Sequence, residues 1–485
     1  MRRAPILLAV LAAAGLLARG AAAQSAAVRF PDTGPGRLLE EYVELCDAPS
    51  LEAFSAWDSA HIAPAILERQ SLRSIAEDDV RQCRDNGGFE PRRIETDEPS
   101  RVDLLAIGKR SGLWTRLTLG VDSAGAIRQL GIFPALPPES TLPEVPDDAA
   151  LARALREKVR RLSEAGMFSG IVEIARGGKV IAVATGGWAD REARTPITGS
   201  SRFTIGPMGK MFTAVAVGQL VDRGELSFAD TVDKLFPDYP NETVRHQVTV
   251  GMLLSHTSGM GDFQARRTPE MLEHGVERAS EFMPLYESDS LKFAPGTDWA
   301  YSNAGLALAG AIVEKVAGQP YPGYLREHVF APAGMTGSDP NNVPHADSAL
   351  VTPYTRFSPK GPPGDSLHEA EHDIGSPAGG AISTADDLVR FAGALRSGEL
   401  VSPTTFREMT RPHGNPGYGY AMEIHEVYGR TVVGHGGGFP GVSTHLDLVT
   451  GSPYTVVVLS NLDPPAEARI SRYAVALAVE KAKRE

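Results

Sequence analysis

The strand patterns in the C-terminal two thirds of the chain lie near the two ends of that region. Residues 169–176 and 180–186 are rich in β-branched and other apolar residues and are joined by Gly177-Gly178-Lys179, a hairpin signal. Four further strand patterns cover residues 422–428, 430–435, 443–447 and 454–461. Helical patterns fill most of the sequence between the two sets. We therefore expect an α+β fold in which one sheet is assembled from segments far apart in the sequence.

Helical patterns account for most of the rest of this region. The first covers residues 147–164 and carries an apolar stripe that includes Leu151, Leu155 and Val159, which predicts a helix with one buried face. The others cover residues 304–316, 384–397, 403–409 and 466–483, and a loop region is expected over residues 336–376.

Lys210 follows Pro207 by three residues at the start of an apolar segment that reads FTIGPMGKMFTA over residues 203–214. Residues three apart share one face of a helix, so the Lys210 amine can reach a group at position 207. Proline suits the first turn of a helix, because the backbone N–H that it lacks has no intrahelical partner there. The segment therefore predicts a helix that begins near Pro207.

Two polar motifs follow this segment in the sequence. Tyr301-Ser302-Asn303 leads into the helical pattern over residues 304–316, and His435-Gly436-Gly437-Gly438 lies in a glycine-rich stretch before Phe439. Two supporting stretches read LLSHTSG over residues 253–259 and GGAISTADDL over residues 379–388. Five motifs in a fixed order make a chance match improbable.

In this order the motifs resemble those of the serine beta-lactamase and penicillin-binding superfamily. The resemblance is greatest to the class C beta-lactamase-related serine hydrolases, whose motifs read S-x-x-K, Y-x-N and, in some members, H-x-G. It covers about residues 148–485 and places Pro207 where the family has its nucleophilic serine. The fold that it implies is an antiparallel sheet flanked by helices, with a helical subdomain and the active site between the two parts.

The resemblance also implies roles for individual residues. Lys210 and Tyr301 match the lysine and the tyrosine that move the proton during acyl transfer. The substrate-binding residues that it implies are Asn303, His435, Gly437 and Gly438. Gly438 is matched to the strand residue whose backbone N–H holds the oxyanion. No metal and no cofactor is implied.

Pro207 bears directly on activity. Proline has no hydroxyl to form an acyl-enzyme and no backbone N–H to hold an oxyanion. Loss of a nucleophile costs on the order of 10⁶ in kcat, and loss of one oxyanion donor costs roughly 10²–10³. We therefore expect a catalytically impaired homologue, a pseudoenzyme whose cleft binds a small-molecule, peptide, muropeptide or ester-like ligand. Thr204 and Ser302 are not expected to replace the missing nucleophile.

The alternative is an active serine hydrolase of the esterase, peptidase or beta-lactamase type, for which Pro207 would be an atypical residue of this sequence. Other histidines carry weaker hypotheses. We expect His256 to be a helix-end or turn residue rather than a base. We expect His368 and His372, which lie among carboxylates, to belong to a solvated acidic loop rather than to a metal site.

The N-terminal third has a different pattern. Helical stretches over residues 37–46, 50–70 and 79–85 precede strand patterns over residues 101–107, 113–121 and 126–133. We interpret residues 25–133 as a small α+β domain that resembles the nuclear-transport-factor-two-like fold. Residues 134–146 form a proline-rich, semi-rigid linker, and residues 147–485 form the beta-lactamase-related domain.

Residues 1–23 have the pattern of a secretory signal peptide, with Arg2 and Arg3, an apolar stretch and Ala21-Ala22-Ala23. No later stretch approaches the ~20 apolar residues of a membrane span, so we expect an exported, periplasmic or secreted chain without a stable span. The only cysteines, Cys46 and Cys83, can form a disulfide or remain two buried thiols. The net charge of −12 argues against a nucleic-acid partner, and the oligomeric state stays open.

Overall fold

The computed structural model describes residues 28–341, 349–357, 366–370 and 374–485. The predicted signal peptide over residues 1–23 and His372 therefore lie outside the described residues. In the part of the chain that is described, no helix is long and apolar enough to cross a membrane.

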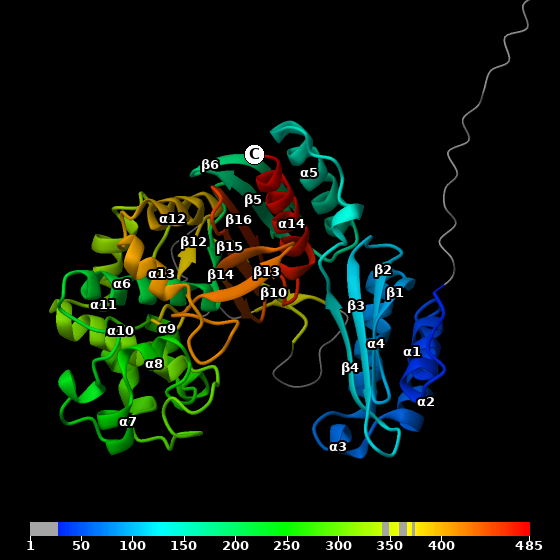
Figure 1. Cartoon of the computed structure of the whole chain (residues 1–485), viewed down its shortest axis with the longest axis horizontal. Helices are drawn as coiled ribbons and strands as arrows, with labels where there is room; N and C mark the ends of the chain where they lie inside the picture. Colours follow the sequence, from blue (N-terminus) through cyan, green and yellow to red (C-terminus); the bar gives the residue numbers. More distant parts are fainter. Residues whose placement is uncertain (1–27, 342–348, 358–365, 371–373) are drawn as a thin grey trace, which may run out of the picture.

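The N-terminal part is a layer of helices on an antiparallel sheet with the strand order β1-β2-β3-β4 (Figure 1). Its elements are α1 (Gly34–Leu45), α2 (Leu51–His61), α3 (Pro64–Leu67), α4 (Leu72–Asn86), β1 (Phe89–Glu98), β2 (Arg101–Gly108), β3 (Trp114–Val121) and β4 (Ile127–Pro134). Tyr42, Phe54 and Leu117 are fully buried between the two layers. A disulfide joins Cys46 at the end of α1 to Cys83 in α4, which decides between the two alternatives for these cysteines.

Three sequence expectations for this part were wrong in detail. The helix expected over residues 50–70 is interrupted, because Ala63 precedes Pro64 and adopts the extended conformation that proline imposes on its neighbour. The third helix, α4, begins at Leu72 rather than near residue 79, and the Ser71 hydroxyl caps it. Strand β1 was not expected.

The C-terminal part is built on a six-stranded antiparallel sheet with the order β13-β14-β15-β16-β5-β6. The strands are β5 (Gly170–Arg176), β6 (Lys179–Gly186), β13 (Glu423–Val427), β14 (Arg430–Phe439), β15 (Val442–Val449) and β16 (Tyr454–Ser460). Strand β5 pairs with β16, so the sheet joins the two ends of this part, as the sequence predicts.

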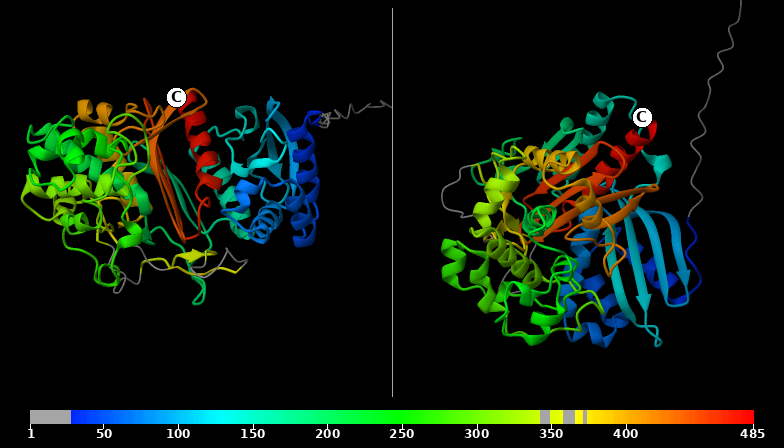
Figure 2. Two further views of the ribbon diagram at one scale, coloured as in Figure 1. Left: turned by 90° about the horizontal axis from the view of Figure 1, so that it is seen from below. Right: turned by 60° about the vertical axis from the view of Figure 1, so that its left-hand side comes forward.

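Helices cover both faces of this sheet. On β5, Val172 and Ile174 contribute to a core formed with α5 (Asp148–Glu164) and α14 (Ala468–Arg484). Ile171 and Ala175 face the opposite way, into the core of the helical part. Figure 2 shows α14 between the sheet and the N-terminal part.

The helical part contains the segments between β6 and β13. Its helices are α6 (Lys210–Asp222), α7 (Glu242–Gln247), α8 (Val250–Leu254), α9 (Pro269–His274), α10 (Asn303–Ala317), α11 (Tyr321–Leu325), α12 (Ala385–Ser397) and α13 (Pro403–Met409), with 3-10 turns at Gly206–Gly209, Val232–Lys234, Gln264–Arg266 and Ala279–Leu285 and a π turn at Arg326–Phe330. Short strands pair as β7 (Trp188–Asp190) with β8 (Thr195–Pro196), β9 (Phe203–Thr204) with β12 (Ile382–Ser383), and β10 (Tyr354–Thr355) with β11 (His368–Glu369). The last pair lies where a loop was expected. The fold is therefore α+β, with antiparallel sheets flanked by helices and a helical subdomain, as expected.

Candidate active site

The segment around Pro207 turns sharply from β9 into α6. Gly206 has a φ of 54°, in the left-handed region that favours glycine, and Pro207 occupies the first turn of the 3-10 helix Gly206–Gly209. Helix α6 continues from Lys210 and is buried along most of its length. Pro207 itself is half-buried, so the site reaches the surface of the molecule.

The glycine-rich strand lies directly against this turn. A Cβ atom on Gly437 would lie 2.0 Å from the Ile205 carbonyl oxygen, and one on Gly206 would lie 3.6 Å from the Gly438 nitrogen. The Thr444 hydroxyl of the neighbouring strand donates a hydrogen bond of 2.8 Å to the same Ile205 carbonyl. Only a residue without a side chain at position 437 therefore allows β14 to approach Ile205, two residues before Pro207, so closely.

Lys210 is fully buried one turn beyond Pro207. Its Nζ donates to Asn303 Oδ1 at 2.8 Å and to the backbone carbonyl of Ala378. The same nitrogen lies 4.7 Å from the centre of the Tyr301 ring. The structure thus brings Lys210, Tyr301 and Asn303 together, although they lie on segments far apart in the sequence.

The Tyr301-Ser302-Asn303 motif opens α10. The Ser302 hydroxyl accepts a hydrogen bond from the Gly305 N–H at 2.9 Å, which caps the helix, and donates to the Gly261 carbonyl at 3.0 Å. Asn303 Nδ2 donates to Asp262 Oδ2 at 2.5 Å, which orients the amide so that its oxygen accepts from Lys210. Ser302 is therefore a structural residue of the motif.

Tyr301 keeps its proton in this environment. Burial raises the pKa of its phenol well above the usual value, and the nearby carboxylates of Glu423 and Asp262 raise it further. A tyrosine with a raised pKa is a proton donor and a poor general base.

Two histidines are linked through Tyr418. The Ser302 N–H donates to His256 Nδ1 at 3.2 Å, so the ring proton of neutral His256 lies on Nε2, which donates to the Tyr418 hydroxyl at 3.0 Å. That hydroxyl in turn donates to His435 Nε2 at 2.9 Å, and His435 Nδ1 donates to the Gly436 carbonyl at 2.5 Å. The chain of donors is satisfied with both histidines neutral.

The electrostatics favour the same protonation. Burial lowers the pKa of His256 and of His435, and the Lys210 ammonium lowers both further, although Glu423 opposes this at His435. His256 has a φ of 62° just after α8, which agrees with a helix-end residue, and it also fixes His435 through Tyr418.

Removal of the Tyr418 hydroxyl tests this chain of hydrogen bonds. Tyr418→Phe leaves the His256 donor and the His435 acceptor unpaired in a buried site, so we expect the free energy of unfolding to fall by about 2 kcal/mol. Urea denaturation followed by circular dichroism measures the change. Tyr420→Phe is the control, because the Tyr420 hydroxyl has no hydrogen bond to any described residue, and an equal loss in both variants would contradict the role of Tyr418.

Sequence reasoning did not find three contributors to this site: the Tyr418 hydroxyl, the Asp262 carboxylate and the Ala378 carbonyl. Tyr418 lies in Gly417-Tyr418-Gly419-Tyr420, a pattern that only its distance from His256 makes informative. The Ala378 carbonyl is a backbone group and has no sequence signal. His368, in contrast, is exposed on the short strand β11, where it pairs with Thr355 of β10.

Comparisons with known proteins agree with this fold. The family model described as Beta-lactamase matches residues 151–480. The chain is 28% identical over 328 residues to a penicillin-binding protein of Bacillus subtilis (strain 168). This alignment covers 63% of this chain and 71% of the relative. It is 30% identical over 293 residues to Esterase EstB of Burkholderia gladioli, covering 54% and 73%.

Among solved structures, a penicillin binding protein from Bacillus halodurans is similar, with a TM-score of 0.56 and 29% identity over 66% of this chain and 97% of that chain. The chain therefore belongs to the beta-lactamase family, which includes penicillin-binding proteins and esterases among its relatives.

Proposed function

We propose that this protein is an exported member of the beta-lactamase family that has lost acyl-enzyme chemistry at Pro207 and retains its site for binding a peptide, muropeptide or ester-like ligand. The observation that carries the proposal is the place of Pro207: the first turn of the helix that leads to Lys210, against the glycine-rich strand. A serine there would supply both the nucleophile and an oxyanion N–H, and proline supplies neither.

The remaining polar groups support retention of a binding site. Lys210 is held by Asn303 and by a backbone carbonyl rather than by a nucleophile. Gly438 is exposed beside the turn, so that the strand backbone is open to a ligand. Lys210 and Tyr301 are proposed to occupy the positions of the catalytic lysine and tyrosine of the family. The residues proposed to bind the ligand are Asn303, His435, Gly437 and Gly438.

A covalent probe gives the direct test. We expect a fluorophosphonate or a fluorescent penicillin to leave the intact mass of the protein unchanged, because no hydroxyl is present at position 207. Intact-mass spectrometry after prolonged incubation measures the adduct. Stoichiometric acylation would overturn the proposal in favour of an active hydrolase, and peptide mapping would then identify the residue that attacks.

A further inference from the structure

A cavity with a volume of about 1220 Å³ opens at the edge of the sheet that lies away from the glycine-rich strand. It lies beside β6, the edge strand opposite β13, and is bounded by α5, by the start of α12 and by loops at residues 197–202 and 336–337. Pro207, Lys210 and Tyr301 do not line it. The cavity is therefore separate from the site described above.

A buried carboxylate lies at the wall formed by β5. Glu173 is only 4% exposed, and its Oε2 accepts no hydrogen bond from any residue that the structure describes. Its cross-strand neighbour on β6, Val183, is 41% exposed, so the cavity extends over this pair of residues. Burial, and to a smaller degree Asp386, raise the pKa of Glu173 to about 7. An unpaired buried carboxylate is costly, and a donor from a ligand would remove that cost.

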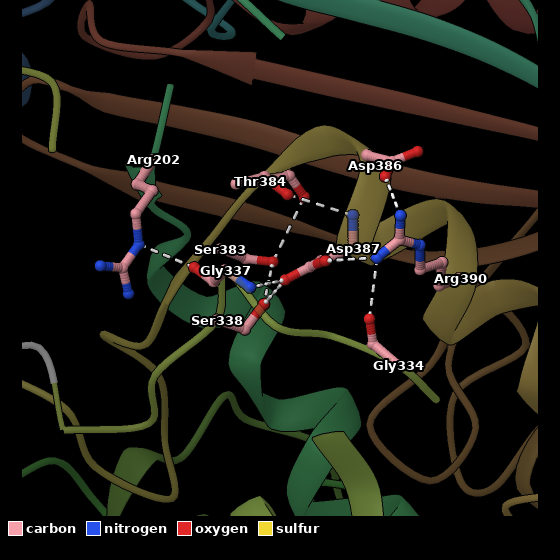
Figure 3. Close-up of polar contacts among 9 residues, drawn as sticks. All are labelled: Arg202, Gly334, Gly337, Ser338, Ser383, Thr384, Asp386, Asp387 and Arg390. Carbon is pink, nitrogen blue, oxygen red and sulfur yellow. Dashed lines mark hydrogen bonds and ion pairs between the residues drawn. The ribbon is translucent and has the colours of Figure 1, made fainter. Parts of the chain in front are cut away.

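The start of α12 forms a fixed acidic wall (Figure 3). Asp387 Oδ2 accepts from the Gly337 N–H at 2.7 Å and from the Ser338 hydroxyl at 2.8 Å. Arg390 lies 2.6 Å from Asp386 and also donates to the Gly334 carbonyl at 2.9 Å. These hydrogen bonds hold the start of α12 against the loop at residues 334–338.

The opposite rim is basic. Arg153, Arg156 and Arg160 lie three and four residues apart on α5, which places them on one face of the helix. Arg160 is paired with Glu157 at 2.8 Å and with Glu164 at 2.7 Å. Arg153 and Arg156 are exposed and make no ion pair with any of the described residues, so they are available to an anionic group.

The cavity thus has an acidic side with an unpaired carboxylate and a basic side with two unpaired arginines. We propose that it binds a small zwitterion, such as a dipeptide with free ends, with its ammonium group at Glu173 and its carboxylate at Arg153 and Arg156. Such a ligand satisfies both sets of charges at once, whereas an anion or a cation alone satisfies one. The proposal does not depend on the function assigned to the Pro207 site.

Isothermal titration calorimetry with L-alanyl-L-alanine and D-alanyl-D-alanine tests this. We expect saturable binding of at least one dipeptide, and at least about tenfold weaker binding of its N-acetyl and amide derivatives, which lack one charge each. The proposal is overturned if the derivatives bind as tightly as the parent dipeptides. It is also overturned if neither dipeptide binds at a concentration of about 10 mM.

Variants place the ligand in the cavity. Glu173→Gln, and separately the double variant Arg153→Ala with Arg156→Ala, should each raise the Kd by about tenfold or more, since hydrogen bonds to charged groups are the strong ones. Arg128→Ala, an exposed arginine on β4, is the matched control and should bind as the parent does. Circular dichroism shows whether each variant is folded. If Glu173→Gln does not fold, the double variant of the exposed Arg153 and Arg156 still tests the proposal.

Pro207→Ser separates this proposal from the proposed function, because it should leave the binding unchanged whether or not it restores hydrolysis. A Kd that is unaffected by both cavity variants would place the dipeptide elsewhere and overturn the assignment.

Discussion

Pro207→Ser should raise the hydrolysis of p-nitrophenyl acetate by about 10² or more over the parent protein. The substitution returns the attacking hydroxyl and the backbone N–H together, and each contributes at least this much in serine hydrolases. The N–H lies in the first helical turn, where it has no intrahelical partner, so it is free to hold an oxyanion. Release of p-nitrophenol at neutral pH, with the parent as reference, measures the rate.

Two controls separate the contributions. Pro207→Ala returns the N–H without the hydroxyl, so it should form no acyl-enzyme and remain close to the parent. Pro207→Ser combined with Lys210→Ala should lose the gain, because the serine needs the amine to take its proton. A folded Pro207→Ser variant with the parent's rate would show that the site has changed beyond one residue, and a search for ligands would then replace the search for substrates.

The second large effect concerns the core of the N-terminal part. Asp58 is fully buried in α2, and neither of its carboxylate oxygens accepts a hydrogen bond from a described residue. Asp79 in α4 accepts from the Tyr42 hydroxyl at 2.7 Å through one oxygen only. Burial raises the pKa of each carboxyl to about 7. The folded state therefore holds two protons that an unfolded chain releases at lower pH.

The sign of the pH dependence follows from these shifts. An unfolded aspartate loses its proton near pH 4, whereas the folded one keeps it up to about pH 7. The unfolded state thus binds fewer protons between these values, so stability should fall as the pH rises from 4 to 7 and level off above that. Asp58→Asn removes its share of this penalty, and we expect it to be more stable than the parent by about 4 kcal/mol at pH 8 and nearly equal to it at pH 4.

Hydrogen exchange of the peptides that cover α2 and α4, measured at increasing urea concentrations at pH 4 and pH 8, reports the stability of this part. Glu52→Gln is the matched control, since Glu52 is exposed on the same helix and its loss should change little at either pH. A variant with the same advantage at both pH values would contradict a protonation effect and indicate a packing effect.

The sequence predicted the central sheet well, because its strands are apolar on both faces. Residues such as Val172 and Val457 have few alternatives to a buried strand. Strand β1 was missed for the opposite reason. It is an edge strand with Pro91, Arg92 and Arg93 in its first half, and its pairing with β2 has two register shifts, so it lacks the regular alternation that marks a strand.

The sequence predicts those site residues whose side chains carry the chemistry. It does not predict contacts that depend on how the folded segments are arranged in space. Lys210 and Asn303 were expected near each other, and they are in hydrogen-bond contact. The Tyr418 bridge and the Ala378 carbonyl depend on how distant segments meet, which no local pattern encodes. Glu173 resembles any charged residue in a strand until its burial and its open neighbour Val183 are known.

The pairing of β5 with β16 has a consequence for how the protein is made. Strand β5 is synthesised long before its neighbour, and until β16 emerges it can pair only with β6. Pairing β5 with β16 closes a long segment of chain, and this costs conformational entropy that local contacts do not offset. Completion of the sheet is therefore a late and slow step of folding. For the exported chain proposed above, this order keeps the central core open until the last strand has crossed the secretion channel. The ion pair of 2.7 Å between Arg176 and Glu485 then links β5 to the residue that caps α14.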